Sequence, residues 1–412
     1  MNSARSGEAA IIALTGVSHA LAHIYTLALP AVLILLKREF GLNDYHLGAI
    51  ATLMNFSFGL GSLPAGVIVD RIGSKRMLLI YLVGGGLASL GVGLTHSAVQ
   101  LACALGALGL ACSIYHPAGL AILSRSCRSR GMALGIHGVG GSAGITIAPL
   151  LTGAVAAVLG WRAAYTVLGV LGLFVALAAW FLPIQEWRAG ESPAHPRDAH
   201  ESLSSSSLML SFVIVCGAII GISICFQGAS TFLNMHISQQ IKQGGLDRAV
   251  LLGNLYTSVA MGAGILGQMV GGYVADRTHR EEAAMVVATA ACVPSLILIG
   301  LLTGLATAGA AMSFAFFYFA TQPLNNCLIA KYTSPRLRGA AFGLTSFLTF
   351  GVASLGAVLA GYVANLWGAV SYVFPTMAVS AAVSAVFCVV LWRIDAARRK
   401  QVPGVAGLEG TR

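Results

Sequence analysis

The sequence predicts an all-α membrane protein with twelve transmembrane helices in two pseudo-symmetric six-helix bundles. Three observations lead to this fold class. Of the 412 residues, 57% are hydrophobic and 9% are charged, and the mean hydropathy is +0.82, whereas about 25% charged residues are usual in soluble domains. Apolar runs of about 20 residues recur along the chain. Patterns in the first half of the sequence also return in the second half.

The length of the apolar runs predicts that they are membrane-spanning helices. Examples cover residues 9–36, 77–94, 163–182 and 369–392, and about twelve such runs can be marked. A helix of about 20 apolar residues crosses the hydrocarbon core of a bilayer, which is roughly 30 Å thick. Because lipid offers no water to the backbone, only helices and closed barrels span it. These runs are too long for barrel strands and do not alternate as such strands do.

A polar stretch divides the chain into two halves. Residues 183–207, PIQEWRAGESPAHPRDAHESLSSSS, are rich in proline, serine and charge, as linkers are. We expect an N-terminal six-helix bundle over residues 1–183 and a cytoplasmic linker over 184–207. A C-terminal six-helix bundle then covers residues 208–394, and a cytoplasmic tail covers 395–412.

The two halves repeat one another in sequence. Two patterns return in the same order, Gly66-x3-Asp70-Arg71 as Gly272-x3-Asp276-Arg277 and Arg130-Gly131 as Arg338-Gly339. Parallel repeats of six helices are typical of one large class of secondary transporters.

The basic residues predict the orientation in the membrane. With the N-terminus inside, all of the 24 lysines and arginines fall on the inner side except Lys37, Arg38, Arg162, Lys242 and Arg248. This distribution satisfies the positive-inside rule and predicts that both termini lie in the cytoplasm. We expect the protein in the inner or plasma membrane of the cell. The net charge of +10 is therefore a topology signal, and we expect no nucleic-acid partner.

At the Asp70 motif the chain resembles the major facilitator superfamily, and the resemblance covers essentially all of it. The family signature between spans two and three is G-x-x-x-D-[RK]-x-G-[RK]-[RK]. The matching residues are Gly66, Asp70, Arg71, Gly73 and Lys75, and Ser74 stands at one of the basic positions.

The resemblance implies a gate at the cytoplasmic face. In the family, the carboxylate of this motif faces the start of span eleven, which here is Arg338. By pseudo-symmetry, Asp276 of the Asp276-Arg277 pair would face Arg130 at the start of span five. Such contacts would latch the gate when it closes. The alternative interpretation is a solvated loop that follows the positive-inside rule.

Polar side chains form helical stripes on the spans that line the central cavity in the resembled family. We expect the pathway of substrate or protons to include His19, His23, His116, His137, Gln227, Thr231, Asn234, Tyr318, Gln322 and Asn325. All 14 acidic residues fall in loops, tails or helix ends, and no lysine or arginine lies in mid-span. Since intramembrane charges mark ion relays and charged-substrate sites, a neutral or weakly charged solute is favoured.

Histidine is the side chain in these spans that titrates near neutral pH. His19 and His23 are one helical turn apart, and His116 and His137 come from spans four and five. Three interpretations remain open: a relay for protons or contact with substrate, a shared metal ion, and hydrogen bonding between helices. We assign no resident metal and no cofactor.

Span five carries a second family resemblance. Gly144, Pro149 and Gly153 resemble the antiporter motif G-x-x-x-G-P-x-x-G-G and favour export, while tight helix packing is the alternative use of these small residues. Span four has Leu105 where proton-coupled drug exporters of the superfamily carry an arginine. The stretch SIYHPAG looks more like the fosmidomycin-resistance branch, although Ala118 replaces its acidic residue.

Together these observations predict a secondary active transporter that works by alternating access, and not an enzyme. We expect proton-coupled efflux of a small neutral or weakly charged organic solute by a monomer in the lipid bilayer. The alternatives are uptake or facilitated diffusion of a small metabolite, histidine-based transport of a divalent metal, and a membrane sensor that transports nothing.

Overall fold

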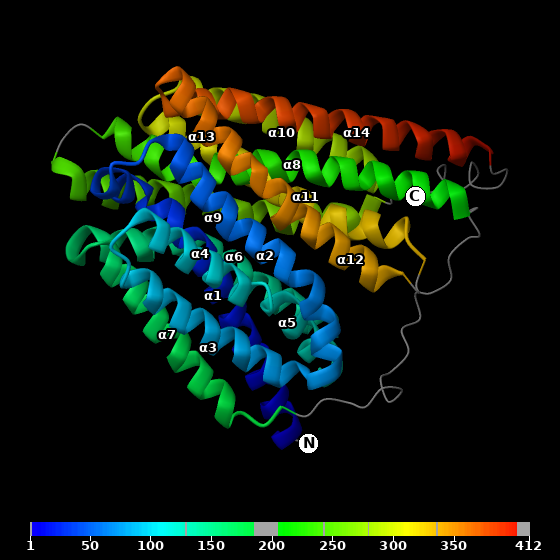
Figure 1. The fold of residues 1–412 in the computed structure, drawn as a ribbon. Helices are drawn as coiled ribbons and strands as arrows, with labels where there is room; N and C mark the ends of the chain where they lie inside the picture. The colour runs from blue at the N-terminus through cyan, green and yellow to red at the C-terminus, as the bar shows by residue number, and fades with distance from the viewer. Residues whose placement is uncertain are drawn as a thin grey trace.

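The structure, a computed structural model, describes residues 2–127, 130–184, 205–241, 244–278, 280–334 and 337–401. Nearly all of these residues are helical, and no strand occurs among them (Figure 1). The predicted all-α membrane fold is confirmed.

The N-terminal half contains six spans, of which the fourth is broken. Its helices are α1 (Asn2–Phe40), α2 (Asp44–Ile72), α3 (Ser74–Gly93), α4 (Ala98–Cys112), α5 (Tyr115–Ser126), α6 (Arg130–Leu159) and α7 (Trp161–Phe181). The break between α4 and α5 has a local cause. Pro117 has no N–H, and its ring clashes with the carbonyl four residues earlier, at Ser113, where the helix is interrupted.

The C-terminal half repeats this plan. Its elements are α8 (Ser205–Gln240), α9 (Gly245–Thr278), α10 (Glu281–Leu301), α11 (Leu305–Lys331), α12 (Arg338–Ser346), α13 (Leu355–Trp367) and α14 (Val373–Gln401). Between α12 and α13, a π-helical turn η1 (Phe347–Gly351) and a 3₁₀ turn η2 (Val352–Ser354) interrupt span eleven, and a second 3₁₀ turn, η3 (Val370–Tyr372), precedes α14. The helices α8 and α14 extend into the segments expected as linker and tail.

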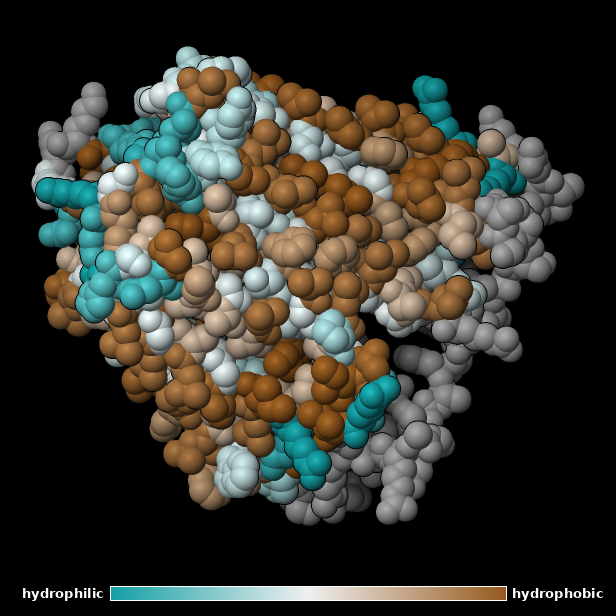
Figure 2. Space-filling model, in the orientation of Figure 1, coloured by the Kyte–Doolittle hydropathy of each residue, from teal (hydrophilic) through white to brown (hydrophobic). Residues whose placement is uncertain are grey.

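Eleven of the described helical segments are long and apolar enough to cross a membrane. The twelfth helix of the predicted set is α11, which has the length to span but is more polar because it carries Gln322, Asn325 and Asn326. The polar stripe expected on span ten therefore also accounts for its weaker hydropathy. In Figure 2, hydrophobic residues cover the flank of the molecule and hydrophilic residues gather toward its ends.

The two halves meet through α2 against α13 and through α6 against α9. A Cβ added at Gly48 would overlap the backbone of Ala357, and one at Gly59 would overlap Gly351, so α2 approaches α13 and η1 with almost no side chain between them. We call the end of the bundle at which α1 turns into α2 the Gly41 end, and the end at which α2 stops the Asp70 end. Figure 1 shows the halves together toward the Gly41 end and splayed toward the Asp70 end.

Polar contacts between the halves lie in the middle of the bundle and toward the Gly41 end. The hydroxyl of Thr52 in α2 donates to the carbonyl of Ser354 at 2.9 Å and accepts from the N–H of Val358 at 3.0 Å. Asn254 of α9 donates to the carbonyl of Ala31 at 3.0 Å. Its side chain fits against Gly153, where a Cβ would overlap it.

Candidate functional site

Four histidines from three helices form a compact cluster inside the N-terminal half. His19 and His23 lie on α1, His116 on α5 and His137 on α6. The ring of His19 is central: its centroid lies 4.9 Å from that of His23, 5.2 Å from that of His116 and 4.2 Å from that of His137. The four histidines expected on the pathway are thus brought together.

Hydrogen bonds assign the tautomer of His19. Its Nδ1 lies 2.9 Å from the carbonyl oxygen of His137. Since a carbonyl only accepts, Nδ1 carries the hydrogen, and Nε2 of the neutral ring is left as an acceptor. Nε2 of His23 lies 3.1 Å from this atom and donates to it.

The other two histidines have different surroundings. The hydroxyl of Tyr115 donates to the carbonyl of Thr15 at 2.5 Å and lies 3.2 Å from Nδ1 of His137. Nε2 of His116 is buried and has no hydrogen-bond partner among the described residues. Buried polar atoms normally have a partner, so His116 has an unmet hydrogen-bonding capacity.

The glycines of α6 make room for this cluster. A Cβ at Gly141 would overlap the ring of His19, and one at Gly144 would overlap the backbone of Ala20. Gly140 faces Gly16 in the same way. The glycine-dense span five therefore packs tightly on α1, and Gly144 of the antiporter-like pattern takes part in this packing.

The cluster reaches the other half of the protein through aromatic rings. His116 stacks on Phe350 of η1, with centroids 5.9 Å apart and planes at 25°. Phe58 of α2 contacts both rings, at 6.0 Å from His116 and 4.5 Å from Phe350. Neither phenylalanine was predicted, because their proximity follows from how the halves dock and no sequence pattern signals it.

The expected polar stripe of the C-terminal half is largely buried. The residues Gln227, Thr231, Asn234, Tyr318 and Asn325 are buried, and Gln322 is partly exposed. Phe226 stacks on Tyr318 at 4.0 Å with the planes 6° apart. Within the described part of the chain, Oδ1 of Asn234 and Oδ1 of Asn325 have no hydrogen-bond partner, so both amides have capacity for a solute.

The π-helical turn η1 links the two polar groups. The side-chain amide of Gln227 donates to the carbonyl of Thr349 at 3.4 Å, while the ring of the next residue, Phe350, stacks on His116. Single π-helical turns inside α-helices occur frequently at functional sites. Here the turn lies between the histidine cluster of one half and the amide stripe of the other.

The residues of the gate motif lie at the Asp70 end. Asp70 and Arg71 are exposed in the last turn of α2, and Gly73, with φ of +92°, joins α2 to α3. Asp276 and Arg277 are exposed at the end of α9. The side chains of Arg130 and Arg338 lie outside the described residues, so both latch pairs stay predictions.

Lys75 has a role that the motif did not predict. Its Nζ donates to the carbonyls of Trp180 at 3.1 Å and Leu182 at 2.7 Å. These carbonyls belong to the last turn of α7, whose final backbone acceptors have no partner inside the helix. Lys75 therefore caps α7 and joins it to α3.

A second charged group at the Asp70 end was not expected either. Glu282, fully buried in the first turn of α10, accepts from Lys331 at 2.6 Å and from the hydroxyl of Tyr332. Lys331 also lies 3.1 Å from Asp395 of α14. Burial and the Glu282 carboxylate raise the pKa of Tyr332 above its usual range, which keeps its hydroxyl protonated as a donor. The network ties α10, α11 and α14 together.

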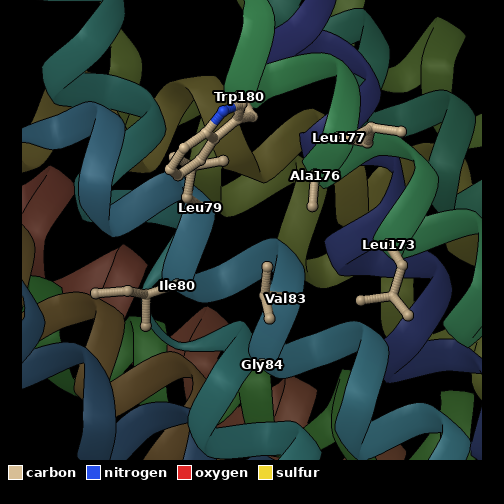
Figure 3. Close-up of a pocket in the computed structure, with 8 residues that line it drawn as sticks. All are labelled: Leu79, Ile80, Val83, Gly84, Leu173, Ala176, Leu177 and Trp180. Atoms are coloured by element: carbon tan, nitrogen blue, oxygen red, sulfur yellow. The ribbon is translucent and has the colours of Figure 1, made fainter.

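An apolar groove between α3 and α7 is separate from these polar groups (Figure 3). Its volume is about 620 Å³, and its lining residues include Ile80, Val83, Leu177 and Trp180. These four side chains are exposed on the outside of the bundle. The groove is lined almost entirely by hydrocarbon, and the indole N–H of Trp180 is the one polar side-chain group among its lining residues.

Residues 14–357 match the family model of the Major Facilitator Superfamily. The uncharacterized transporter YfnC of Bacillus subtilis is 24% identical over 366 residues, which are 85% of each chain. The membrane sensor protein UhpC of Salmonella typhimurium is 25% identical over 82% of this chain and 81% of its own. A probable L-galactonate transporter of Escherichia coli is 26% identical over 149 residues, 36% of this chain and 33% of that protein.

Solved structures agree at the level of fold. A bacterial homolog of the human lysosomal transporter Spinster, crystallised in inward-facing occupied and unoccupied conformations, superposes with TM-scores of 0.71 and 0.72. Each alignment covers 95% of this chain and at least 96% of the other, at 16% identity. With its two six-helix halves, this chain belongs to the Major Facilitator Superfamily and is a membrane transporter, not an enzyme.

Proposed function

We propose that this protein exports a small, neutral or weakly charged organic solute in exchange for protons, with His19 and His23 carrying the proton. We further propose that it works as a monomer in the inner membrane, with both termini in the cytoplasm. The observation that carries the proposal is the histidine cluster: four imidazoles meet inside one half and contact the other half through Phe350.

The chemistry of the lining supports the type of solute. The described side chains of the cluster and of the amide stripe are imidazole, amide, hydroxyl and aromatic groups, with no carboxylate, lysine or arginine among them. An anionic or cationic solute buried there would lack a compensating charge, which is costly. Imidazole, by contrast, changes charge near neutral pH and takes up or releases one proton.

The arrangement of the halves supports alternating access. In the predicted topology the Asp70 end is cytoplasmic, so contacts near the Gly41 end, such as Asn254 with Ala31, close the outer side. Rocking of one half against the other around a midplane site then changes its access. Because His116 touches Phe350 of the other half, such rocking changes the surroundings of the cluster.

The names of relatives support export and also supply the main alternative. Two matched proteins are named for resistance to puromycin and to methyl viologen, over 39% and 31% of this chain. A cis,cis-muconate transport protein matches over 79% of both chains and favours the alternative, uptake of a small metabolite. The Gly144, Pro149 and Gly153 pattern supports export.

Inverted membrane vesicles test the proposal, because export from the cell appears as accumulation in their lumen. Vesicles with and without the protein are compared for accumulation of a solute library under an acid-inside gradient, with and without an uncoupler. We expect gradient-dependent accumulation of at least one solute. In His19→Ala/His23→Ala vesicles, accumulation should no longer depend on the gradient.

The matched control is His236→Ala. His236 is a buried histidine of α8, near Gln240 and the carbonyl of Ile299, outside the cluster. Its variant should keep the dependence on the gradient. Accumulation only under an acid-outside gradient would establish uptake instead. An unchanged pH response in the double variant would leave the histidines with a packing role.

A further inference from the structure

Three imidazoles of the cluster converge on one point. One ligand nitrogen each from His19, His23 and His116 lies within 4.8 Å of the other two. Two of the rings come from neighbouring turns of α1, and the third comes from the first turn of α5, just after the break in span four. All three nitrogens are therefore carried by residues within helices.

The distance between two of the nitrogens matches a shared ion. Zinc–imidazole bonds are about 2.0–2.1 Å long, so two ligands at a tetrahedral ion are roughly 3.3 Å apart. Nε2 of His19 and Nε2 of His23 are 3.1 Å apart.

The hydrogen bond of His19 prepares it as a ligand. Its Nδ1–H is held by the carbonyl of His137, which leaves Nε2 as an acceptor that faces Nε2 of His23. Histidines that bind metals usually donate their second N–H to a carbonyl or carboxylate in this way, because the bond fixes both the tautomer and the ring orientation.

His116 provides the observation that points to a ligand. Its Nε2 is buried without a hydrogen-bond partner among the described residues, although its ring lies 5.2 Å from His19 and 5.8 Å from His23. Leaving a buried nitrogen without a partner costs the protein the free energy of removing that atom from water. A metal ion coordinated by this atom would remove that cost.

We propose that His19, His23 and His116 form a three-histidine site for a first-row transition-metal ion such as Zn²⁺. Neutral imidazole suits zinc, copper and nickel, whereas magnesium and calcium require oxygen ligands that this set lacks. His23 would ligate through Nε2 with its hydrogen moved to Nδ1. A fourth position remains for water, chloride or a donor atom of the solute. The ion and the proton of the proposed exchange would compete for the same nitrogens of His19 and His23. The metal site does not depend on which solute is transported or in which direction.

Binding is tested on the purified full-length protein in detergent, carrying an affinity tag without histidine. Zn²⁺ is titrated by calorimetry, and Co²⁺ is added separately to record the visible absorption of a four-coordinate ion. We expect one ion per chain in the wild type and the intense four-coordinate Co²⁺ spectrum. His116→Ala should weaken Zn²⁺ binding at least about 10-fold and abolish that spectrum.

Two controls separate ligands from neighbours. His236→Ala should bind as the wild type does. His137→Gln keeps the backbone carbonyl that holds His19 and should retain the ion, since its side-chain Nδ1 faces Tyr115. If His116→Ala unfolds, as judged by gel filtration, His23→Gln replaces it and should show the same loss. Wild-type protein that binds no stoichiometric ion overturns the proposal, as does equal affinity in the ligand variant. Because only binding is measured, this outcome is independent of the vesicle assay.

Discussion

The ring of His19 lies where four constraints meet. It bonds the carbonyl of His137, accepts from His23, lies edge-on to His116 and packs against Gly141. The bond to His137 fixes the tautomer of His19, and the bond from His23 supplies the hydrogen that its Nε2 accepts. His116 is the ring beside it, and Gly141 sets its distance from α6. Gly141 therefore makes room for the His19 ring and also lets α6 pack closely on α1.

Gly141→Ala should disturb the protein far more than Gly138→Ala, a glycine change on the same helix. The added Cβ would overlap the His19 ring, and overpacking a close-packed interior costs about 1–3 kcal/mol. We expect a lower midpoint of thermal unfolding in detergent and impaired transport in vesicles. The control is Gly138→Ala, where nothing lies within 4 Å of the added Cβ. Equal behaviour of the two variants would contradict the described contact between α6 and α1.

Thr52 of α2 influences the geometry of span eleven through its hydroxyl group. Its hydroxyl bonds both the carbonyl of Ser354 and the N–H of Val358, a pair that bond each other in an uninterrupted α-helix. Side chains inserted into this ladder are a recognised cause of bends in helices. The irregular turns η1 and η2 lie immediately before this point, so α2 and span eleven are coupled as elements.

Thr52→Val keeps the shape of the side chain and removes both hydrogen bonds. Each is worth about 0.5–1.5 kcal/mol, so the closed Gly41 end should be destabilised by roughly 1–3 kcal/mol relative to the open state. Electron-spin distances between labels at Tyr45 and Trp367 should show a larger open fraction. Thr166→Val is the control because the Thr166 hydroxyl bonds only within its own helix, to Arg162. An unchanged distance distribution would exclude Thr52 as a contact that holds the halves together.

At the scale of the whole molecule, the polar contacts between the halves differ from those within each half. The halves are joined by neutral hydrogen bonds in the middle and toward the Gly41 end, whereas the Asp70 end carries the charged motif and the Glu282 network. Lys75 binds α3 to α7, and Lys331 binds α10 and α14. These ties lie within each half, so each half is braced to move as a unit.

Asp70→Asn should slow transport and leave membrane insertion intact. The exchange removes the charge that the predicted latch with Arg338 requires while keeping the size of the side chain. The initial rate of solute accumulation in inverted vesicles measures the effect, and the amount of inserted protein is determined in parallel. Asp247→Asn, an exposed acid near the Gly41 end, is the matched control. Undiminished flux in Asp70→Asn would end the latch hypothesis.

The sequence predicted the features that are local in the chain. Run length and charge bias are encoded span by span, so the helices and the two halves could be anticipated. The spacing of His19 and His23 placed them on one face. That His116 and His137 join them, and that Phe350 stacks on His116, depends on packing between spans and between halves. Neither α5 nor η1 contains a residue pattern that specifies this docking, and the contact of Lys75 with the end of α7 was not predicted either.

The position of Phe350 has a consequence for energy conversion. An exchanger wastes the proton gradient if its proton site opens to both sides while no solute is bound. Phe350 belongs to one half and the histidines belong to the other, so separation of the halves would move the ring away from His116. In the proposed exchanger, proton leakage without solute is therefore limited by the same rigid-body movement that carries the solute. The side chain of Phe350 is the barrier beside the proton site.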